Sequence, residues 1–274
     1  MSVGSQESCR AGCIQLASGN DRQTNLELAA TLIDEAAGEG CDIVLLPENF
    51  SFMGANDNEK LAVAEEQDSS LTLRFLSQQA ATHRMTIIGG TLPLKAASTG
   101  KVRNSCPLFS PNGEMLACYD KIHLFDVTLP DEQYRESDSV AAGAEPVSVD
   151  SGDWKIGLSV CYDLRFPELY RHYSSIGCTL LSVPAAFTVP TGKSHWQTLL
   201  KARAIENQCY LLAAGQCGSH PGGRKTWGHS MIIDAWGETL AEAENETGII
   251  VADLSLNKLA EIRQAMPVLS HRRM

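Results

Sequence analysis

Short, continuous apolar segments constrain the fold of this chain more than any other feature. Residues 42–46 and 179–183 are largely apolar runs of strand length, and a proline follows each of them. Such runs are typical of strands that are buried on both faces, which requires helices to cover the sheet. Residues 25–39 carry apolar side chains at helical spacing, and Gly40 follows as a typical helix stop. The sequence therefore predicts an α/β fold.

The rest of the chain continues this alternation. We expect further strands at residues 10–16, 85–90, 154–160, 210–215, 228–234 and 248–254, and further helices at residues 70–83, 166–175 and 195–207. A turn at residues 111–113 predicts a hairpin between residues 105–110 and 114–119, which makes the sheet arrangement mixed. Because no linker or repeat divides the chain, we predict one domain over residues 1–274, with residues 1–9 as a flexible N-terminal extension. The strand count favours two stacked sheets with helices outside.

Composition narrows the function classes. The 274 residues carry a formal net charge of -11, and this acidity argues against a nucleic-acid partner because phosphate backbones would be repelled. No apolar run approaches the ~20 residues of a membrane span, so we expect no membrane partner. The N-terminus is polar and acidic and resembles neither a signal peptide nor a basic transit peptide. We therefore expect a cytoplasmic protein.

The nine cysteines do not form a metal or disulfide pattern. Their number is odd, no C-x-x-C occurs, and no Cys/His cluster has zinc spacing. There is also no G-x-S-x-G, G-x-G-x-x-G or P-loop motif. We expect no metal and no organic cofactor, and we expect most cysteines to be buried and inert. A catalytic cysteine has to be recognised by its surroundings.

Two predicted strand ends carry charged residues. Glu48 follows the strand at residues 42–46, where desolvation by apolar neighbours would raise the pKa of its carboxyl and make it a base near neutral pH. Lys121 lies between a strand and an aromatic segment and could donate hydrogen bonds to an oxyanion. Each residue taken alone is better explained as an exposed charge at a strand end or in a loop.

The third strand end is a predicted strand–turn–helix elbow at Cys161. The segment Cys161-Tyr162-Asp163-Leu164-Arg165 follows a small-residue strand, and a helix starts near Pro167. An elbow exposes one side chain and directs the following backbone N–H groups to the same place. A thiol there would be acidified by the helix end and by a nearby cation. The alternative is a buried structural cysteine.

Taken together and in this order, the three segments resemble the nitrilase superfamily of carbon–nitrogen hydrolases. The resemblance covers the chain from residue 12 to its C-terminal end. It implies a nitrilase-like α-β-β-α sandwich with mixed sheets that packs across a twofold axis into a larger sandwich, and hence a homodimer or larger homo-oligomer. It also implies a triad of Glu48, Lys121 and Cys161. A second family carboxylate matches Glu136, with Glu132 as the alternative.

Within that superfamily the chain resembles the deaminated-glutathione amidase branch. The supporting stretches are residues 121–127, 165–169, 203–210, 214–218 and 228–237, whereas the tip at residues 219–224 does not match a pattern that we can place. The resemblance implies hydrolysis of a glutamine-like γ-amide of a small carboxylate, with release of ammonia. Competing activities are an omega-amidase acting on α-ketoglutaramate, an N-carbamoyl amidohydrolase and a nitrilase, and a catalytically vestigial scaffold protein is the alternative outside the enzymes.

The predicted mechanism assigns a role to each site residue. Glu48 takes the thiol proton, Cys161 attacks the amide carbonyl, and Lys121 and the backbone N–H of Tyr162 hold the oxyanion. Arg165 is the candidate ligand of a substrate carboxylate, although an ion pair with Asp163 or Glu168 explains it equally well. Phe187 and Thr188, which follow the strand at residues 179–183, are expected to line the acyl pocket, although a core role explains Phe187 equally well.

Overall fold

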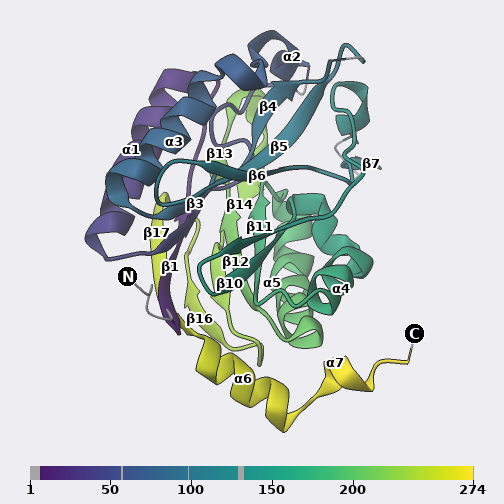
Figure 1. Cartoon of the computed structure of the whole chain (residues 1–274). Helices are drawn as coiled ribbons and strands as arrows, with labels where there is room; N and C mark the ends of the chain where they lie inside the picture. The colour runs from purple at the N-terminus through teal and green to yellow at the C-terminus, as the bar shows by residue number, and fades with distance from the viewer. Residues whose placement is uncertain (1–6, 57, 98, 129–132, 274) are drawn as a thin grey trace.

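Two mixed sheets stack face to face, and helices cover their outer faces (Figure 1). The computed structural model describes residues 7–56, 58–97, 99–128 and 133–273. Helices α1 (Arg22–Gly38) and α3 (Leu71–His83) cover the first sheet, and α4 (Pro167–Ser175) and α5 (Val189–Asn207) cover the second. The predicted α-β-β-α sandwich is confirmed.

The first sheet has seven strands in the order β17-β1-β2-β3-β5-β4, with β6 beside β5. Its strands are β1 (Ser8–Gln15), β2 (Ile43–Leu45), β3 (Thr86–Ile88), β4 (Leu92–Lys95), β5 (Val102–Phe109), β6 (Met115–Asp120) and β17 (Gly248–Ser255). Strands β1, β2 and β3 are parallel, and the other pairs are antiparallel.

The second sheet has six strands in the order β16-β15-β12-β11-β10-β9. Its strands are β9 (Val147–Ser151), β10 (Trp154–Leu158), β11 (Leu180–Ala185), β12 (Tyr210–Gly215), β15 (Met231–Ile233) and β16 (Thr239–Glu242). Strands β10, β11 and β12 are parallel.

Smaller elements complete the fold. They are the ribbon of β7 (Asp126–Thr128) and β8 (Gln133–Arg135), the ribbon of β13 (Cys217–Ser219) and β14 (Lys225–Trp227), the helices α2 (Glu59–Val63), α6 (Leu256–Ala265) and α7 (Val268–His271), and the short helices η1 (Gln67–Ser69), η2 (Glu136–Asp138), η3 (Cys161–Arg165) and η4 (Pro221–Gly223). No helix within the described ranges is long and apolar enough to cross a membrane.

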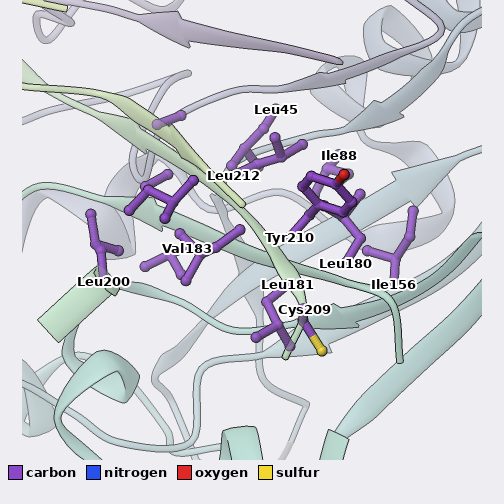
Figure 2. Packing of buried hydrophobic residues seen from close by; sticks show 14 of the residues in the cluster. Leu45, Ile88, Ile156, Leu180, Leu181, Val183, Leu200, Cys209, Tyr210 and Leu212 are labelled. Carbon is purple, nitrogen blue, oxygen red and sulfur yellow. The ribbon is translucent and has the colours of Figure 1, made fainter. Parts of the chain in front are cut away.

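The main core lies between the two sheets. Figure 2 shows Leu45 and Ile88 of the first sheet facing the layer of Ile156, Leu180 and Leu212 of the second, and all five are fully buried. Burying one such side chain contributes about 1.5–3 kcal/mol. A second core lies between the first sheet and its helices α1 and α3. The apolar run before Glu48 is continuous because its side chains alternate between these two cores.

Some predicted boundaries differ from the structure. Helix α5 begins at Val189, before the predicted residue 195, because Pro190 suits a first helical turn while the apolar periodicity starts only later. Ser8 and Cys9 belong to β1 and pair with β17, so the strand begins inside the predicted N-terminal extension. Residues 1–6 of that extension lie outside the described residues. The predicted hairpin is confirmed as β5–β6, and Gly113 has the positive φ of +80° that such a turn favours.

The turn that carries Glu48 depends on a close backbone approach at Gly90. Gly90 has φ +55°, and a Cβ atom there would lie 2.1 Å from the carbonyl oxygen of Pro47. We expect Gly90→Ala to lower the free energy of unfolding by clearly more than Gly152→Ala, measured by urea denaturation. Gly152 has φ +61° with no atom near a Cβ, so its substitution should cost only the about 1–2 kcal/mol of a left-handed alanine. Equal losses in the two variants would contradict the role of this contact.

Candidate active site

Cys161 occupies a strained turn at the end of the β10 segment. It is the first residue of η3 and has φ +48°. This conformation costs a non-glycine residue about 1–2 kcal/mol and persists only where the surrounding structure holds it. Asp163 Oδ2 accepts a hydrogen bond from the backbone N–H of Val160 at 2.8 Å and so fixes the entry to the turn. The predicted elbow is present, and its thiol is buried with 7% exposure.

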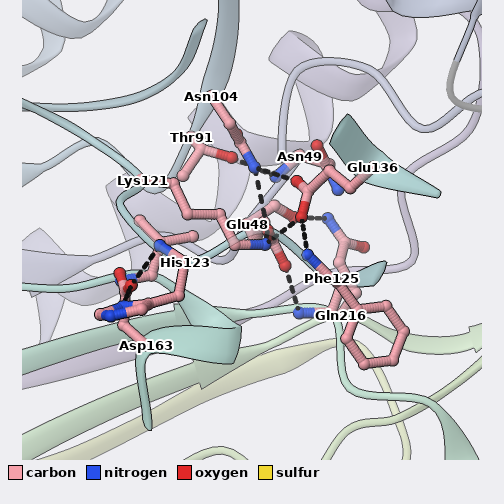
Figure 3. A network of polar contacts seen from close by, with 12 residues as sticks. Glu48, Asn49, Thr91, Asn104, Lys121, His123, Phe125, Glu136, Asp163 and Gln216 are labelled. Atoms are coloured by element: carbon pink, nitrogen blue, oxygen red, sulfur yellow. Dashed lines mark hydrogen bonds and ion pairs between the residues drawn. The ribbon is translucent and has the colours of Figure 1, made fainter. Parts of the chain in front are cut away.

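Glu48 follows β2 and is bound through each of its side-chain oxygens. Oε1 accepts hydrogen bonds from Lys121 Nζ at 2.9 Å and Asn104 Nδ2 at 3.0 Å, and Oε2 accepts one from the Ala186 N–H at 3.0 Å. Gln216 Nε2 donates to the Glu48 carbonyl oxygen at 3.0 Å and supports the turn from below (Figure 3). The charge of the carboxylate also raises the pKa of the Cys161 thiol. Glu48 therefore acts on both other members of the predicted triad.

Lys121 lies between two carboxylates. Besides its contact with Glu48, its Nζ donates to Glu136 Oε2 at 2.8 Å, and all three side chains are buried (Figure 3). Glu136 Oε2 also accepts from the N–H of Phe125 at 2.8 Å. Glu136 is thus the second carboxylate of the cluster, whereas its alternative Glu132 lies outside the described residues.

Asn104 is a site residue that the sequence reading missed. Its Nδ2 donates to Glu48 Oε1 and to Glu136 Oε1, at 3.0 and 3.2 Å, and so bridges the two carboxylates. It lies in β5 with 3% exposure. The available signal was a polar amide within a strand that is otherwise buried, since a buried amide needs partners.

Asp163 is a second residue with an unpredicted position. Its fully buried carboxylate accepts hydrogen bonds from Tyr119 Oη at 2.7 Å and from the His123 N–H at 3.0 Å, and it lies 2.7 Å from His123 Nδ1. The His123 ring stacks on Phe166 at 3.7 Å. Asp163 thereby joins the segment after Lys121 to the turn of Cys161.

One cavity, which we call the inner cavity, brings the predicted site residues together. It has about 430 Å³ of empty volume. Its predicted lining residues are Glu48, Lys121, Glu136, Cys161, Tyr162, Arg165, Phe187 and Thr188. It is also lined by Asn49, Lys60, Phe125, Tyr134, Ala186, Thr191 and Arg224, which the sequence reading did not single out.

Arg165 has no carboxylate partner within the part of the chain that the structure describes. Its guanidinium lies over the rings of Tyr162 and Phe187, at 5.6 and 5.4 Å, and Nη1 lies 3.2 Å from His195 Nδ1. The alternative of an ion pair with Asp163 or Glu168 is wrong, since neither carboxylate forms a salt bridge with Arg165, and Asp163 is occupied by Tyr119 and His123. The fork of Arg165 remains available to a ligand.

The electrostatics of the cluster differ from the sequence-based expectation. Burial alone would raise the pKa of Glu48, but the charge and hydrogen bond of Lys121 outweigh it, and the net pKa is lowered. Burial and then the charge of Glu48 raise the pKa of the Cys161 thiol far above its ordinary value. Burial alone would lower the pKa of Lys121, but Glu136 and Glu48 raise it well above its ordinary value. Both predicted shifts, a raised pKa for Glu48 and an acidified thiol, are therefore wrong. The resting cluster holds a carboxylate, an ammonium and a neutral thiol.

Comparison with known proteins assigns the family. The model of the carbon-nitrogen hydrolases matches residues 10–264. The chain belongs to the carbon–nitrogen hydrolase family. It is accordingly a hydrolase of carbon–nitrogen bonds other than peptide bonds, an amidase of the nitrilase superfamily.

Individual relatives agree with this assignment. The chain is 47% identical to the deaminated glutathione amidase of Synechocystis sp. over 96% of its own length and 97% of that protein. It is 39% identical to the omega-amidase of Bos taurus, covering 96% and 95% of the two chains. Among solved structures, the NitFhit protein of C. elegans superposes with a TM-score of 0.91 at 38% identity, over 97% of this chain and 65% of that longer one.

Removing the charge of Glu48 should affect the acidity of the Cys161 thiol and the rate of hydrolysis in opposite directions. We expect Glu48→Gln to lower the pKa of the Cys161 thiol, because it removes a negative charge that raises this pKa while Lys121 remains. Amide hydrolysis should nevertheless fall by at least about 100-fold, the usual contribution of a positioned base. Iodoacetamide labelling of the Cys161 peptide across pH, read by mass spectrometry, measures the first effect. Glu168→Gln, at an exposed carboxylate in α4, is the control, and an unmoved labelling profile in Glu48→Gln would contradict the electrostatic account.

Proposed function

We propose that this hydrolase cleaves the γ-amide of a small dicarboxylate and that deaminated glutathione is its substrate. The observation that carries the proposal is the buried Glu48–Lys121 ion pair beside the Cys161 thiol, in a cavity that also presents the fork of Arg165. The 47% identity to the Synechocystis deaminated glutathione amidase supports the choice of substrate.

The first half of the reaction forms a thioester. Glu48 accepts the thiol proton as the sulfur attacks the amide carbonyl, so the thiolate is needed only at the moment of attack. The oxyanion that develops receives hydrogen bonds from Lys121 and from the Tyr162 N–H, which belongs to the first turn of η3 and has no acceptor within the helix. Removing one such donor typically costs about 2.7–4 kcal/mol. Glu48 then donates its proton to the departing nitrogen.

The second half releases the acid, and the leaving group depends on the substrate. Glu48 deprotonates a water that attacks the thioester, and the proton returns to Cys161. Ammonia departs only when the amide nitrogen is unsubstituted. In deaminated glutathione that nitrogen belongs to cysteinylglycine, so the dipeptide leaves in place of the ammonia that the sequence reading expected.

The acyl part of the substrate lies against Arg165, Phe187 and Thr188. Arg165 supplies a planar fork for the distal carboxylate, and Phe187 contributes an apolar wall that packs on Trp196 with ring centroids 4.8 Å apart. Phe187 therefore serves both the pocket and the core. We assign Glu136 the role of holding Lys121 in place.

A second candidate is the omega-amidase reaction on α-ketoglutaramate, favoured by the bovine relative. This substrate has the same acyl group and would use the same Arg165 contact. We also propose a homodimer or larger homo-oligomer in the cytoplasm, without nucleic-acid or membrane partners, and light scattering tests the assembly.

The nucleophile is tested by Cys161→Ser. We expect cysteinylglycine release from deaminated glutathione and ammonia release from α-ketoglutaramate both to fall by at least about 1000-fold, as is usual when a nucleophile is removed. Cys118→Ser, at a partly exposed cysteine in β6, is the matched control and should retain activity. Mass spectrometry of the quenched wild-type enzyme should find the acyl adduct on Cys161. Unchanged release by Cys161→Ser would overturn the proposal.

The acyl carboxylate contact is tested by Arg165→Ala. The variant should raise KM for α-ketoglutaramate by roughly tenfold or more, because a charge-assisted hydrogen bond contributes about 1.5–3 kcal/mol. Propionamide, which has no carboxylate, should show little change. Equal increases for both amides would remove Arg165 from carboxylate binding.

A further inference from the structure

Arg224 lies at the junction between the inner cavity and a second one, which we call the outer cavity. The outer cavity has about 1140 Å³ of empty volume and is lined in part by Asn56, Asn58, Gln133 and Gly222. The two cavities share Asn49, Lys60, Tyr134 and Arg224. Arg165 lines only the inner cavity. A substrate that extends from the inner to the outer cavity has to pass Arg224.

The guanidinium of Arg224 has hydrogen-bond donors that no protein acceptor uses within the described residues. Its Cζ lies 5.3 Å from the centre of the Tyr134 ring, and Nη2 donates a long hydrogen bond of 3.5 Å to the Ala186 carbonyl oxygen. Nε is buried without a hydrogen-bond partner, and within the described residues no carboxylate forms an ion pair with this side chain. Because a guanidinium carries five N–H donors, most of its capacity is available for a bound anion.

The loop that carries Arg224 is held on both sides. Gly222 has φ +75°, and a Cβ atom there would lie 2.6 Å from the Ala55 carbonyl oxygen, so only glycine allows this approach. The buried ring of His220 lies 2.8 Å from the Ser18 carbonyl oxygen and 2.7 Å from Thr226 Oγ1. Such anchoring keeps the arginine at the junction before a ligand arrives.

We propose that Arg224 binds a second carboxylate, which the substrate carries on its leaving group. The inference rests on the proposed cleavage of a γ-amide, in which Glu48 protonates the departing nitrogen. Ala186 links the two residues, since its N–H donates to Glu48 Oε2 and its carbonyl oxygen accepts from Arg224. We therefore place the leaving group on the Arg224 side of this carboxylate and the acyl part toward Arg165, which shares η3 with the nucleophile.

This arrangement selects a substrate class. The preferred substrate is a γ-amide whose nitrogen bears a short acidic peptide, and a dipeptide extends at most about 7 Å, which the outer cavity can hold. Cysteinylglycine in deaminated glutathione meets this requirement through its terminal carboxylate. An unsubstituted amide such as α-ketoglutaramate has no group for Arg224. The residue thus distinguishes the two proposed substrates.

The test compares three substrates with wild type, Arg224→Gln and Arg224→Lys. The substrates are deaminated glutathione, the same compound with its terminal carboxylate converted to an amide, and α-ketoglutaramate. We expect Arg224→Gln to lower kcat/KM for deaminated glutathione by roughly 10- to 100-fold, as expected for loss of a charge-assisted contact, and to change the other two values little. Arg224→Lys keeps the charge without the fork and should retain part of the preference. Lys225→Gln, at the exposed next residue, is the matched control.

The outcomes separate this inference from the proposed function. Equal losses on all three substrates would mean that Arg224 only supports the fold around Tyr134, and they would overturn the inference while amidase activity stands. A wild-type enzyme that does not prefer the free carboxylate over its amide would overturn it as well. A wild-type enzyme without activity on any γ-amide would overturn both proposals.

Discussion

The ammonium group of Lys121, buried between Glu48 and Glu136, is the interaction on which the site depends. Taking a charge out of water costs several kcal/mol per ion, and only close pairing with further hydrogen bonds offsets that cost. Here Lys121 Nζ lies 2.8 and 2.9 Å from the two carboxylates, and the amide of Asn104 donates a further hydrogen bond to Glu48. Removing one member would leave a buried charge uncompensated, at a cost of about 3–5 kcal/mol. The cluster therefore holds the ends of β2 and β6 together by the same contacts that prepare the reaction.

Asp163 fixes the position of the nucleophile relative to Lys121. It binds the N–H before Cys161 and, across 40 residues of sequence, the N–H of His123 two residues after Lys121. Burial and the charge of Asp163 raise the pKa of Tyr119, so the phenol stays protonated and donates to the carboxylate. The thiol and the ammonium are thus positioned by one carboxylate that contacts neither of them directly. An uncharged replacement would leave three donors competing for a weaker acceptor.

Features that depend on a few adjacent residues could be predicted from the sequence, whereas features that depend on contacts between residues far apart in the sequence could not. The apolar run before Glu48, the β5–β6 hairpin and the Cys161 elbow each follow from a few adjacent residues, and the structure has all three. The pKa direction of Glu48 did not follow, because it is decided by Lys121, 73 residues away. Asn104 escaped notice for the same reason, and the tip at residues 219–224, which carries Arg224, was noted but matched no pattern that assigns it a role. The pairing of β1 with β17 joins two segments that lie far apart in the sequence and has no local signal.

Reactivity of one cysteine among nine has to come from something other than thiol acidity. All nine thiols have a raised pKa, and burial is the first cause in each case. Cys161 differs because it lines the inner cavity together with Glu48 and Lys121, whose charges both act on its thiol. Its proton can move to Glu48 as a bond to carbon forms, so the charge passes to an oxyanion that Lys121 can stabilise. Because its pKa is raised, the thiol of Cys161 is mainly protonated without a bound carbonyl, which would slow its reaction with oxidants and alkylating agents that require the thiolate.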